Sequence, residues 1–225
     1  MLFQVVLALG FAPIVSASPP AAKPASLHTL KDLQVTTGRV HEPNPGELVI
    51  DEPEVRAVLR SGTARFAAVN FEYAGPTARS AALASGRIRR QLALKLRARD
   101  GCNVVYVAWR IAPESGIEVT VKRNPGLSRH AQCGSRGYSR VIPDHAIEPV
   151  AIERGTSHSL EVALDGRELR VHADGALAWE GRLPADSLQF DGAAGFRTDN
   201  ARLRLTFWTD AGRRSSEAAR LGTQP

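Results

Sequence analysis

The chain has 225 residues, a formal net charge of +6 and two cysteines, and 25 of its 29 basic residues are arginine. A chain of this length can bury a core of its own, so it is not a disulfide-dense mini-protein. Its 43% hydrophobic and 23% charged residues are ordinary globular values, which argue against disorder, a coiled coil or several membrane spans.

The N-terminal stretch is uncharged and apolar over residues 2–15, and small residues follow it. It is too short to cross a bilayer, which needs about 20 apolar residues. Its length and the triplet Val15-Ser16-Ala17 predict a signal peptide over residues 1–17, and hence a secreted or periplasmic protein after cleavage near Ala17. A buried terminal strand or helix is the alternative, because no Lys or Arg precedes the apolar run.

The remaining chain divides into a linker, one domain and a tail. Residues 18–26 are rich in Pro and Ala and are expected to form an extended linker, and residues 209–225 a flexible polar tail. Between them, residues 27–208 contain no linker-like break and no repeat. Apolar and polar residues alternate there with a period of two, which is typical of β-strands. Short strands are expected at 47–50, 55–59, 64–73 and 117–122.

The clearest prediction is a long hairpin over residues 86–113, with Asp100-Gly101 as a two-residue turn. Apolar residues of the two strands then meet in the pairs Leu92–Trp109, Leu94–Val107 and Leu96–Val105. A slip of one residue would place the leucines in water, which fixes the register. The opposite face, expected to be solvated, pairs Gln91 with Arg110, Ala93 with Ala108, Lys95 with Tyr106 and Arg97 with Val104.

A second hairpin is predicted over residues 158–173, with Asp165-Gly166 as its turn. This register places Leu160 opposite Val171, and it forms an opposite-charge pair between Glu161 and Arg170.

The chain then turns again through Asp174-Gly175-Ala176, which is expected to be a three-residue loop that brings Leu177 and Trp179 to the dry side. A last strand over residues 202–208 points Leu203, Leu205 and Phe207 inward. Eight or more antiparallel strands and no helical period predict an all-β fold, a two-sheet antiparallel β-sandwich of the jelly-roll type.

The two cysteines, Cys102 and Cys133, are 31 residues apart. In an oxidising compartment they most simply form one disulfide, worth about 3 to 4 kcal/mol in the chain-entropy model. The alternative is a pair of free thiols or a nucleophile, although the sequence shows no adjacent base.

The run from Ser157 to Phe207 contains hairpin glycines, inward leucines and a closing turn at Gly195 and Thr198-Asp199-Asn200. These features resemble the second half of the concanavalin A-like lectin/glucanase superfamily, with LamG-like and 3-keto-disaccharide hydrolase-type jelly rolls the most similar. The resemblance implies this fold and a sugar-related function, but fold alone does not decide function. The glucanase branch carries its acids as Glu-x-Asp-x-x-Glu, and that motif does not occur in this sequence.

Motifs for metal or cofactor binding are not found: the histidines lack zinc-ligand spacing, and no phosphate-binding loop or nucleophile elbow occurs. We therefore expect no metal and no cofactor. Asp199 and Asn200 are candidate calcium ligands, but the favoured interpretation is that their side chains close a tight turn onto the backbone.

Six basic residues are expected on the solvated face of the long hairpin: Arg87, Arg89, Lys95, Arg97, Arg99 and Arg110. Such a face attracts a polyanion, but a merely solvated face is the favoured interpretation, since a GC-rich genome also produces arginine in excess. Within it, the small pair Ala93 and Ala108 would form a trough, with a ligand floor of Gln91, Lys95, Tyr106 and Arg110. The alternative is that this face is convex and only wet.

The sequence therefore leaves three functions open. The first is an exported, non-catalytic module, expected to be a monomer, that binds a glycan or anionic polymer. Nucleic acid is not expected as a partner, because only 6% of residues are aromatic and none is interleaved at stacking spacing. The second is a carbohydrate-active hydrolase whose acids come from Glu72, Glu118 and Asp144, which requires two carboxylates in one cleft. The third is a structural or adhesive domain with a protein partner.

Overall fold

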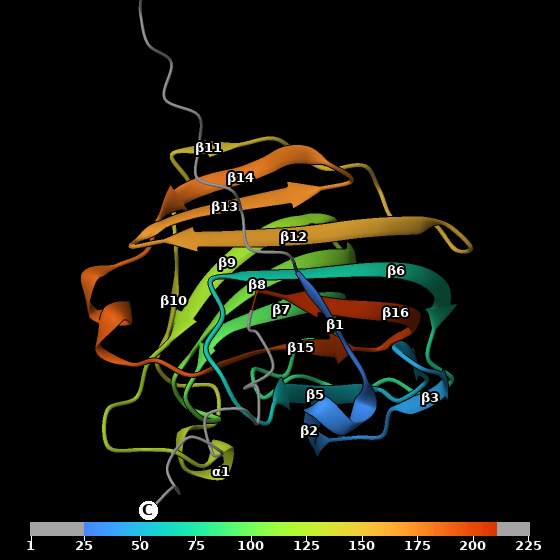
Figure 1. The fold of residues 1–225 in the computed structure, drawn as a ribbon, viewed down its shortest axis with the longest axis horizontal. Helices are drawn as coiled ribbons and strands as arrows, with labels where there is room; N and C mark the ends of the chain where they lie inside the picture. Colours follow the sequence, from blue (N-terminus) through green and yellow to red (C-terminus); the bar gives the residue numbers. More distant parts are fainter. Residues whose placement is uncertain (1–24, 211–225) are drawn as a thin grey trace, which may run out of the picture.

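The computed structural model describes residues 25–210, which form two antiparallel sheets that pack face to face (Figure 1). The expected β-sandwich is thereby confirmed. The predicted signal peptide lies outside the described residues, as do most of the predicted linker and tail.

Among the described residues, the first sheet has nine strands in the order β11-β14-β13-β12-β6-β16-β4-β3, with β1 beside β16. Its strands are β1 (Ser26–His28), β3 (His41–Asn44), β4 (Glu47–Ile50), β6 (Phe66–Pro76), β11 (His145–Ala146), β12 (Ser157–Asp165), β13 (Glu168–Ala173), β14 (Ala176–Arg182) and β16 (Ala201–Thr209). We call it the nine-stranded sheet.

The second, seven-stranded sheet of the described chain has the order β10-β9-β8-β7-β15-β5-β2. Its strands are β2 (Leu33–Thr37), β5 (Glu54–Leu59), β7 (Arg90–Ala98), β8 (Val104–Ala112), β9 (Gly116–Lys122), β10 (Tyr138–Arg140) and β15 (Ala193–Asp199). Helical structure within residues 25–210 is limited to α1 (His130–Cys133) and two 3-10 turns, Leu30–Asp32 and Ala185–Gln189. The four short strands predicted from the alternation correspond to β4, β5, β6 and β9.

The core lies between the two sheets, because every second side chain along a strand points to the inner face of its sheet. Leu92, Leu94 and Leu96 of β7 are fully buried there, in one cluster with Leu160 and Val162 of β12. Full burial of a leucine side chain contributes about 1.5 to 3 kcal/mol. The apolar face of the predicted long hairpin is therefore the inner face of the seven-stranded sheet.

The predicted register of the β7–β8 hairpin is confirmed from Gln91 to Leu96, but the predicted two-residue turn at the end of the hairpin is wrong. Arg97 adopts a positive φ of 52°, and β7 ends at Ala98 instead of reaching a two-residue turn. The Asp100 carboxylate accepts the backbone N–H groups of Cys102 and Asn103 at 2.7 and 2.9 Å. An aspartate that captures nearby backbone donors makes a turn of its own, so the loop is longer than two residues.

The β12–β13 hairpin is shifted by two residues from the predicted register. Asp165 pairs with Glu168, so Gly166 and Arg167 form the loop, and Glu161 lies opposite His172 rather than Arg170. Gly166 has a φ of 56°, and a glycine at the first of two loop positions suits a type II′ turn. A shift of two keeps every side chain on its face, so the inward residues were predicted correctly.

The next loop has two residues rather than the predicted three. Asp174 and Gly175 both have positive φ, at 52° and 79°, and Ala173 pairs with Ala176. Two consecutive positive φ angles match the type I′ turn, whose twist suits a hairpin. Trp179 still lies opposite Val171 and is buried, whereas Leu177 pairs with His172 after a register shift.

Candidate ligand-binding groove

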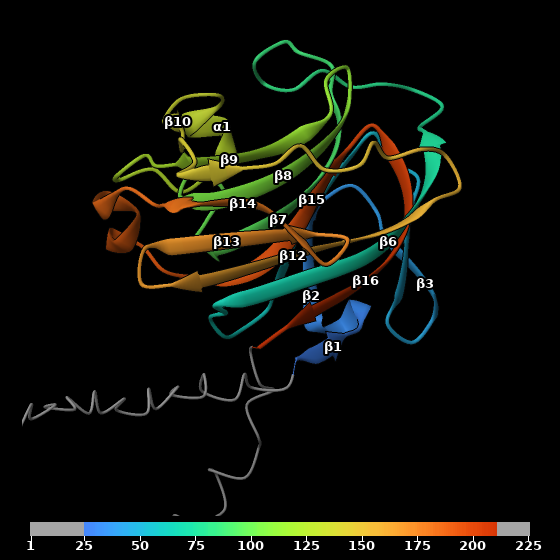
Figure 2. The same cartoon turned by 90° about the horizontal axis from the view of Figure 1, so that it is seen from above.

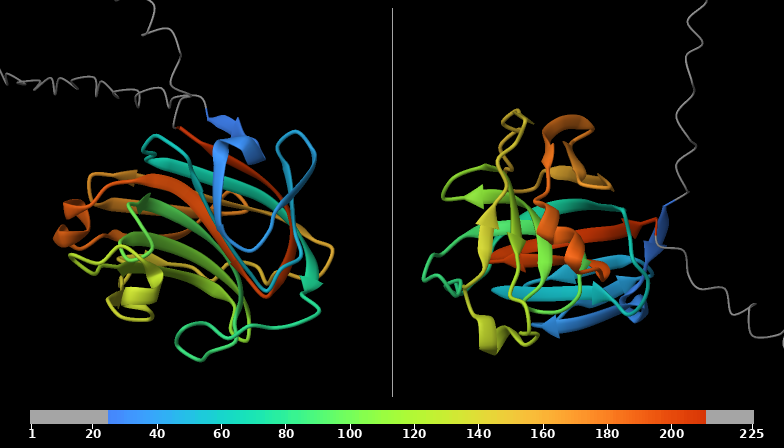
Figure 3. Two further views of the ribbon diagram at one scale, coloured as in Figure 1. Left: turned by 90° about the horizontal axis from the view of Figure 1, so that it is seen from below. Right: turned by 90° about the vertical axis from the view of Figure 1, so that its left-hand side faces the viewer.

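The outer face of the seven-stranded sheet holds a groove with a volume of about 430 Å³. This volume lies within the usual range for small-molecule sites. Two loops form its ends: residues 77–89, which precede β7, and residues 123–137, which contain α1. Both loops lie on the side of this sheet that faces away from the nine-stranded sheet (Figures 2 and 3).

The floor of the groove is a row of five residues that are direct neighbours across the strands. In order from β5 to β9 they are Arg56, Arg197, Ala93, Ala108 and Glu118. Neighbouring strands are about 4.8 Å apart, so the row spans roughly 19 Å. Two methyl groups thus lie between a pair of cations and a carboxylate, and all five residues line the groove.

The Arg197 guanidinium is held in place at this floor. Its Nε donates to Asp199 Oδ2 at 2.8 Å and its Nη2 to Asp199 Oδ1 at 3.0 Å. It also lies 5.6 Å from the centre of the Tyr106 ring, a distance suited to a cation–π contact. Burial alone lowers the pKa of Arg197, but the Asp199 carboxylate more than offsets this and raises it. Arg197 therefore stays charged.

Gln91 joins the same network from β7. Its Nε2 donates to Asp199 Oδ2 at 2.7 Å. Its Oε1 has no hydrogen-bond partner among the described residues. An unmet buried acceptor is costly, so the amide has a remaining capacity to accept a hydrogen bond.

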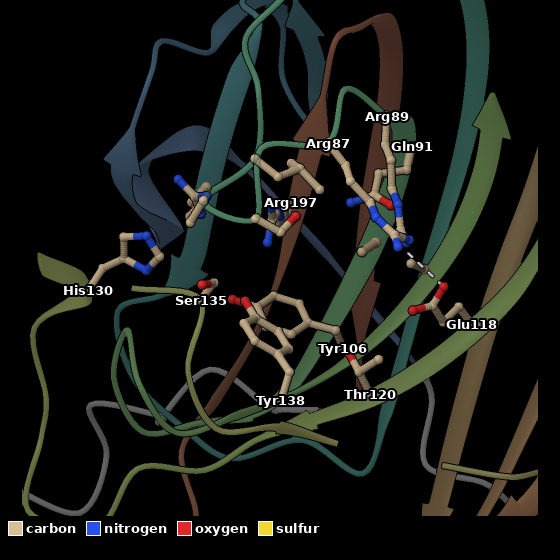
Figure 4. Close-up of a pocket in the computed structure, with 16 residues that line it drawn as sticks. Arg87, Arg89, Gln91, Tyr106, Glu118, Thr120, His130, Ser135, Tyr138 and Arg197 are labelled. Atoms are coloured by element: carbon tan, nitrogen blue, oxygen red, sulfur yellow. Dashed lines mark hydrogen bonds and ion pairs between the residues drawn. The ribbon is translucent and has the colours of Figure 1, made fainter. Parts of the chain in front are cut away.

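Two tyrosines form one side of the groove. The rings of Tyr106 and Tyr138 are stacked, with centroids 6.1 Å apart, and Tyr138 remains 39% exposed. Burial raises the pKa of Tyr106, so its hydroxyl is neutral at physiological pH. In Figure 4 the two hydroxyl groups point toward Ser135 and His130, and Arg197 lies nearby. This end of the groove combines aromatic surface with hydrogen-bonding groups.

Two buried lysines lie near this end of the groove. Burial lowers the pKa of Lys95 to about 7, and repulsion from Arg56 and Arg197 contributes. Within the described residues its Nζ donates one long hydrogen bond of 3.5 Å, to the carbonyl of Ala57. Burial, with the same two arginines, lowers the pKa of Lys122 to about 8, and this Nζ donates to the carbonyls of Gly101 and Gly134. Neither lysine forms an ion pair within the described part of the chain.

The opposite end of the groove carries a compact ion-pair group. Glu118 lies 3.4 Å from Arg89 and 3.1 Å from Arg110, and Arg110 also lies 3.6 Å from Glu114. The dashed line in Figure 4 marks the contact between Arg89 and Glu118. Arg87 lines the same end, is exposed, and forms no ion pair with any residue that the structure describes.

The expected solvated strip of six basic residues is wrong in its details. Arg87 and Arg89 precede β7 and belong to the loop, while Lys95 is only 5% exposed. The positive φ of Arg97 sends its guanidinium to the backbone carbonyls of Ser187, Leu188 and Phe190. The face was expected to be wet because the alternation alone does not show that loops from elsewhere in the chain cover it.

Asn200 fixes the loop of residues 77–89. Its Oδ1 accepts the Ala81 N–H at 2.7 Å, and its Nδ2 donates to the carbonyls of Ala81 and Arg89 at 2.9 and 2.8 Å. Its φ of 54° is a conformation that asparagine tolerates better than most residues. The prediction that Asp199 and Asn200 close their own turn is thus wrong: Asn200 binds the backbone of another loop, and Asp199 binds the side chains of Gln91 and Arg197.

The second loop, residues 123–137, is fixed by the disulfide between Cys102 and Cys133. The bond that the sequence predicted is therefore present. Asn103 adds a hydrogen bond from its Nδ2 to the carbonyl of Leu127, and its Oδ1 accepts the N–H of Asn124. These contacts hold the segment that carries His130 and Ser135 over the end of the sheet.

The structure places two of the four predicted ligand residues in the groove and the other two at separate positions. Gln91 and Tyr106 line the groove, while Lys95 lies buried outside its lining. Arg110 lines a second, adjoining hollow of about 400 Å³ and is held by Glu118.

The three candidate acids are not brought together. Glu118 lines the groove, Glu72 lies in β6 of the other sheet, and Asp144 directly precedes β11. Within residues 25–210 no group of three His, Cys, Asp or Glu residues is arranged to hold a metal ion. No helix in that range is long and apolar enough to cross a membrane.

Sequence reasoning missed Arg56, Arg197, His130 and Tyr138. The first two reach the floor through the β5–β15–β7 pairing, which joins strands far apart in the chain. Tyr138 comes from a three-residue edge strand that shows no readable alternation. The nearest available signal was the disulfide, because it predicts that the loop containing His130 folds back to the hairpin end.

No protein-family model and no curated protein sequence matches the chain. Among solved structures, it is similar to the carbohydrate-binding module CBM66 from Bacillus subtilis, with a TM-score of 0.54 and 11% identity over 77% of this chain and 91% of that one. It is also similar to the GH43 protein BlXynB (mutant K247S) from Bacillus licheniformis, with a TM-score of 0.51 and 13% identity over 83% of this chain but 38% of that one. At these identities the likeness shows the fold.

Fold and groove together define the class: a two-sheet antiparallel β-sandwich with a polar groove on the outer face of one sheet. The chain spans less than two fifths of the length of the GH43 protein, so it matches only part of that protein.

Proposed function

We propose that this protein is an exported, non-catalytic module that binds a carbohydrate or cell-envelope polymer in the groove of the seven-stranded sheet. The observation that carries the proposal is the floor row, in which Ala93 and Ala108 separate Arg197 from Glu118. A sugar ring has an apolar face bordered by hydroxyl groups. Small side chains flanked by fixed donors and acceptors match both features.

The tyrosine pair supports the same ligand class. Tyr138 offers partly exposed aromatic surface beside the floor, and Tyr106 holds it in place by stacking. An aromatic ring with a polar hydroxyl contributes both area and a hydrogen bond at a binding site. The structural neighbour from Bacillus subtilis is itself described as a carbohydrate-binding module, which favours this ligand class for the shared fold.

The state of Glu118 favours binding without catalysis. It is the single carboxylate among the described residues that line the groove, and it is engaged by Arg89 and Arg110. Glycoside hydrolysis normally requires a pair of carboxyl groups, one of them kept protonated. Glu118 has no second carboxylate beside it in the groove lining, so it is better suited to accept hydrogen bonds from sugar hydroxyls than to act in a catalytic pair.

Export is supported by two features. The apolar N-terminal stretch has the length of a signal peptide. The Cys102–Cys133 bond suits an oxidising compartment, since disulfides are rare in the reducing cytosol.

A glycan array tests the binding proposal. The mature chain should bind a defined subset of glycans, and Tyr138→Ala should weaken that binding at least about tenfold, which corresponds to roughly 1.4 kcal/mol. Leu188→Ala is the matched control, because Leu188 is 43% exposed and lies outside the groove lining. Array signals that are the same for wild type and Tyr138→Ala would remove the groove from consideration.

A further inference from the structure

We propose that the glycan is acidic and that the Arg56–Arg197 end of the groove binds a carboxylate carried by one of its sugars. This inference rests on the proposed function and names its ligand class. Beyond glycan binding, the inference assigns a negative charge to the ligand and names the end of the groove that binds this charge.

This end of the groove carries an excess of positive charge. Arg56 and Arg197 are direct cross-strand neighbours, an arrangement of like charges that is unfavourable by itself. Each has one acidic partner on its own strand, Glu54 for Arg56 and Asp199 for Arg197. Lys95 and Lys122 add positive charge when they are protonated, and neither has a carboxylate partner in the described chain. The two arginines are locally neutralised, and the two lysines are not.

The geometry of Arg197 also favours a carboxylate at this end. Asp199 occupies one edge of the guanidinium, through Nε and Nη2. Arginine has five N–H donors in a planar fork, and no described residue accepts a hydrogen bond from the edge formed by Nη1 and the second Nη2 hydrogen. Arg197 lines the groove, and Figure 4 shows it beside Tyr106 at the hollow. A planar edge with two parallel donors matches a carboxylate, which binds guanidinium groups in a bidentate manner.

The surrounding titratable groups support a positive field here. The pKa of His130 is lowered first by burial and then by repulsion from Lys122 and from both arginines. The same two arginines contribute to the lowered pKa of Lys95 and Lys122. Nearby acids act in the opposite direction without offsetting the effect: Asp199 on Lys95, Asp100 on Lys122 and Glu54 on His130. A bound anion would relieve this repulsion.

The opposite end of the floor orients such a ligand. Glu118 already occupies the guanidinium groups of Arg89 and Arg110, so these two arginines are less available to a second carboxylate, while the Glu118 oxygens can accept hydroxyl groups. A sugar carboxylate therefore belongs at Arg197, and neutral hydroxyl groups belong at Glu118.

The test compares three acidic polysaccharides, polygalacturonate, alginate and hyaluronate, each with its methyl-esterified form, by titration calorimetry on the mature chain. We expect at least one acidic form to bind about tenfold more tightly than its own ester. Arg56→Gln should reduce this preference at least about fivefold, whereas Arg56→Lys should keep most of it. Circular dichroism and urea unfolding confirm that each variant is folded.

Arg182→Gln is the matched control, since it removes the same charge from an exposed ion pair with Glu168 on the other sheet. It should change the affinity less than about twofold. Binding of the esters equal to that of the acids would overturn the inference and leave the proposed function intact. If Arg56→Gln and Arg182→Gln lose the same amount of affinity, and dextran sulfate binds the wild type as tightly as the acidic polysaccharides do, then the binding is non-specific electrostatic attraction and the inference is overturned. No binding to any glycan on the array or in this set would overturn the proposed function as well.

Discussion

The buried amine of Lys95 gives a sharp prediction about stability. Its side chain is 5% exposed and its Nζ has one long hydrogen bond, to Ala57. Burial lowers its pKa from 10.5 to about 7, so the unfolded chain binds more protons than the folded chain between these two values. The unfavourable contribution of Lys95 is therefore absent above about pH 10.5, grows as the pH falls, and is complete below about pH 7.

Lys95→Met should remove this contribution while keeping the packing of the alkyl chain. At 1.36 kcal/mol per pH unit, the lowered pKa corresponds to roughly 4 to 5 kcal/mol at pH 6 and about 1 kcal/mol at pH 10. The free energy of unfolding of the variant, relative to wild type, should thus be about 3 to 4 kcal/mol higher at pH 6 than at pH 10.

Urea unfolding followed by tryptophan fluorescence at the two pH values measures this difference. Taking the variant relative to wild type at each pH cancels the titration of other groups. Lys31→Met is the control, because Lys31 is exposed and should give no such pH dependence. A gain that is the same at pH 6 and pH 10, or a loss of stability at pH 6, would refute the assignment of Lys95 as a buried amine under electrostatic repulsion.

Three further predictions concern the loops and the charge of the groove. Asn200→Gly keeps the positive φ but loses three hydrogen bonds to the loop of residues 77–89, so urea unfolding should show a loss of about 2 to 3 kcal/mol. Calorimetry should show weaker glycan binding, and unchanged binding would contradict the placement of this loop at one end of the binding groove. Replacing Cys102 and Cys133 together by alanine should lower the free energy of unfolding by about 3 to 4 kcal/mol, and an effect below about 1 kcal/mol would contradict it. An acidic glycan should bind more tightly as the pH falls from about 9 to about 6, and the complex should take up protons as it forms, because the bound anion raises the lowered pKa values of Lys95, Lys122 and His130. Calorimetry in buffers of different ionisation enthalpy measures this proton uptake. Release of protons on binding would contradict the negative charge of the ligand.

The fold was predictable because its strands alternate so regularly. The β7–β8 register from Gln91 to Leu96 follows from the match of apolar faces alone. That local pairing also placed Ala93 opposite Ala108, which is the centre of the groove floor. The turns were less predictable, because positive φ at Arg97 and the hydrogen bonds of Asp100 decide the loop, and alternation contains neither.

The charged ends of the groove depend on contacts between distant parts of the chain. Arg197 meets Ala93 and Arg56 only when β15 inserts between β5 and β7. The burial of Lys95 and Tyr106 likewise depends on structure that the hairpin itself does not contain. A sequence pattern can assign a side chain to one face of a sheet, but it cannot show what lies over that face.

The most direct test of the account is where a glycan binds on the sandwich. Amide chemical shifts of the 15N-labelled mature chain, recorded during titration with the polysaccharide fragment that binds best, give that position. The account predicts the largest changes at Arg56, Ala93, Ala108, Tyr138 and Arg197, on the outer face of the seven-stranded sheet. Changes confined to β12, β13 and β14 of the nine-stranded sheet would contradict it.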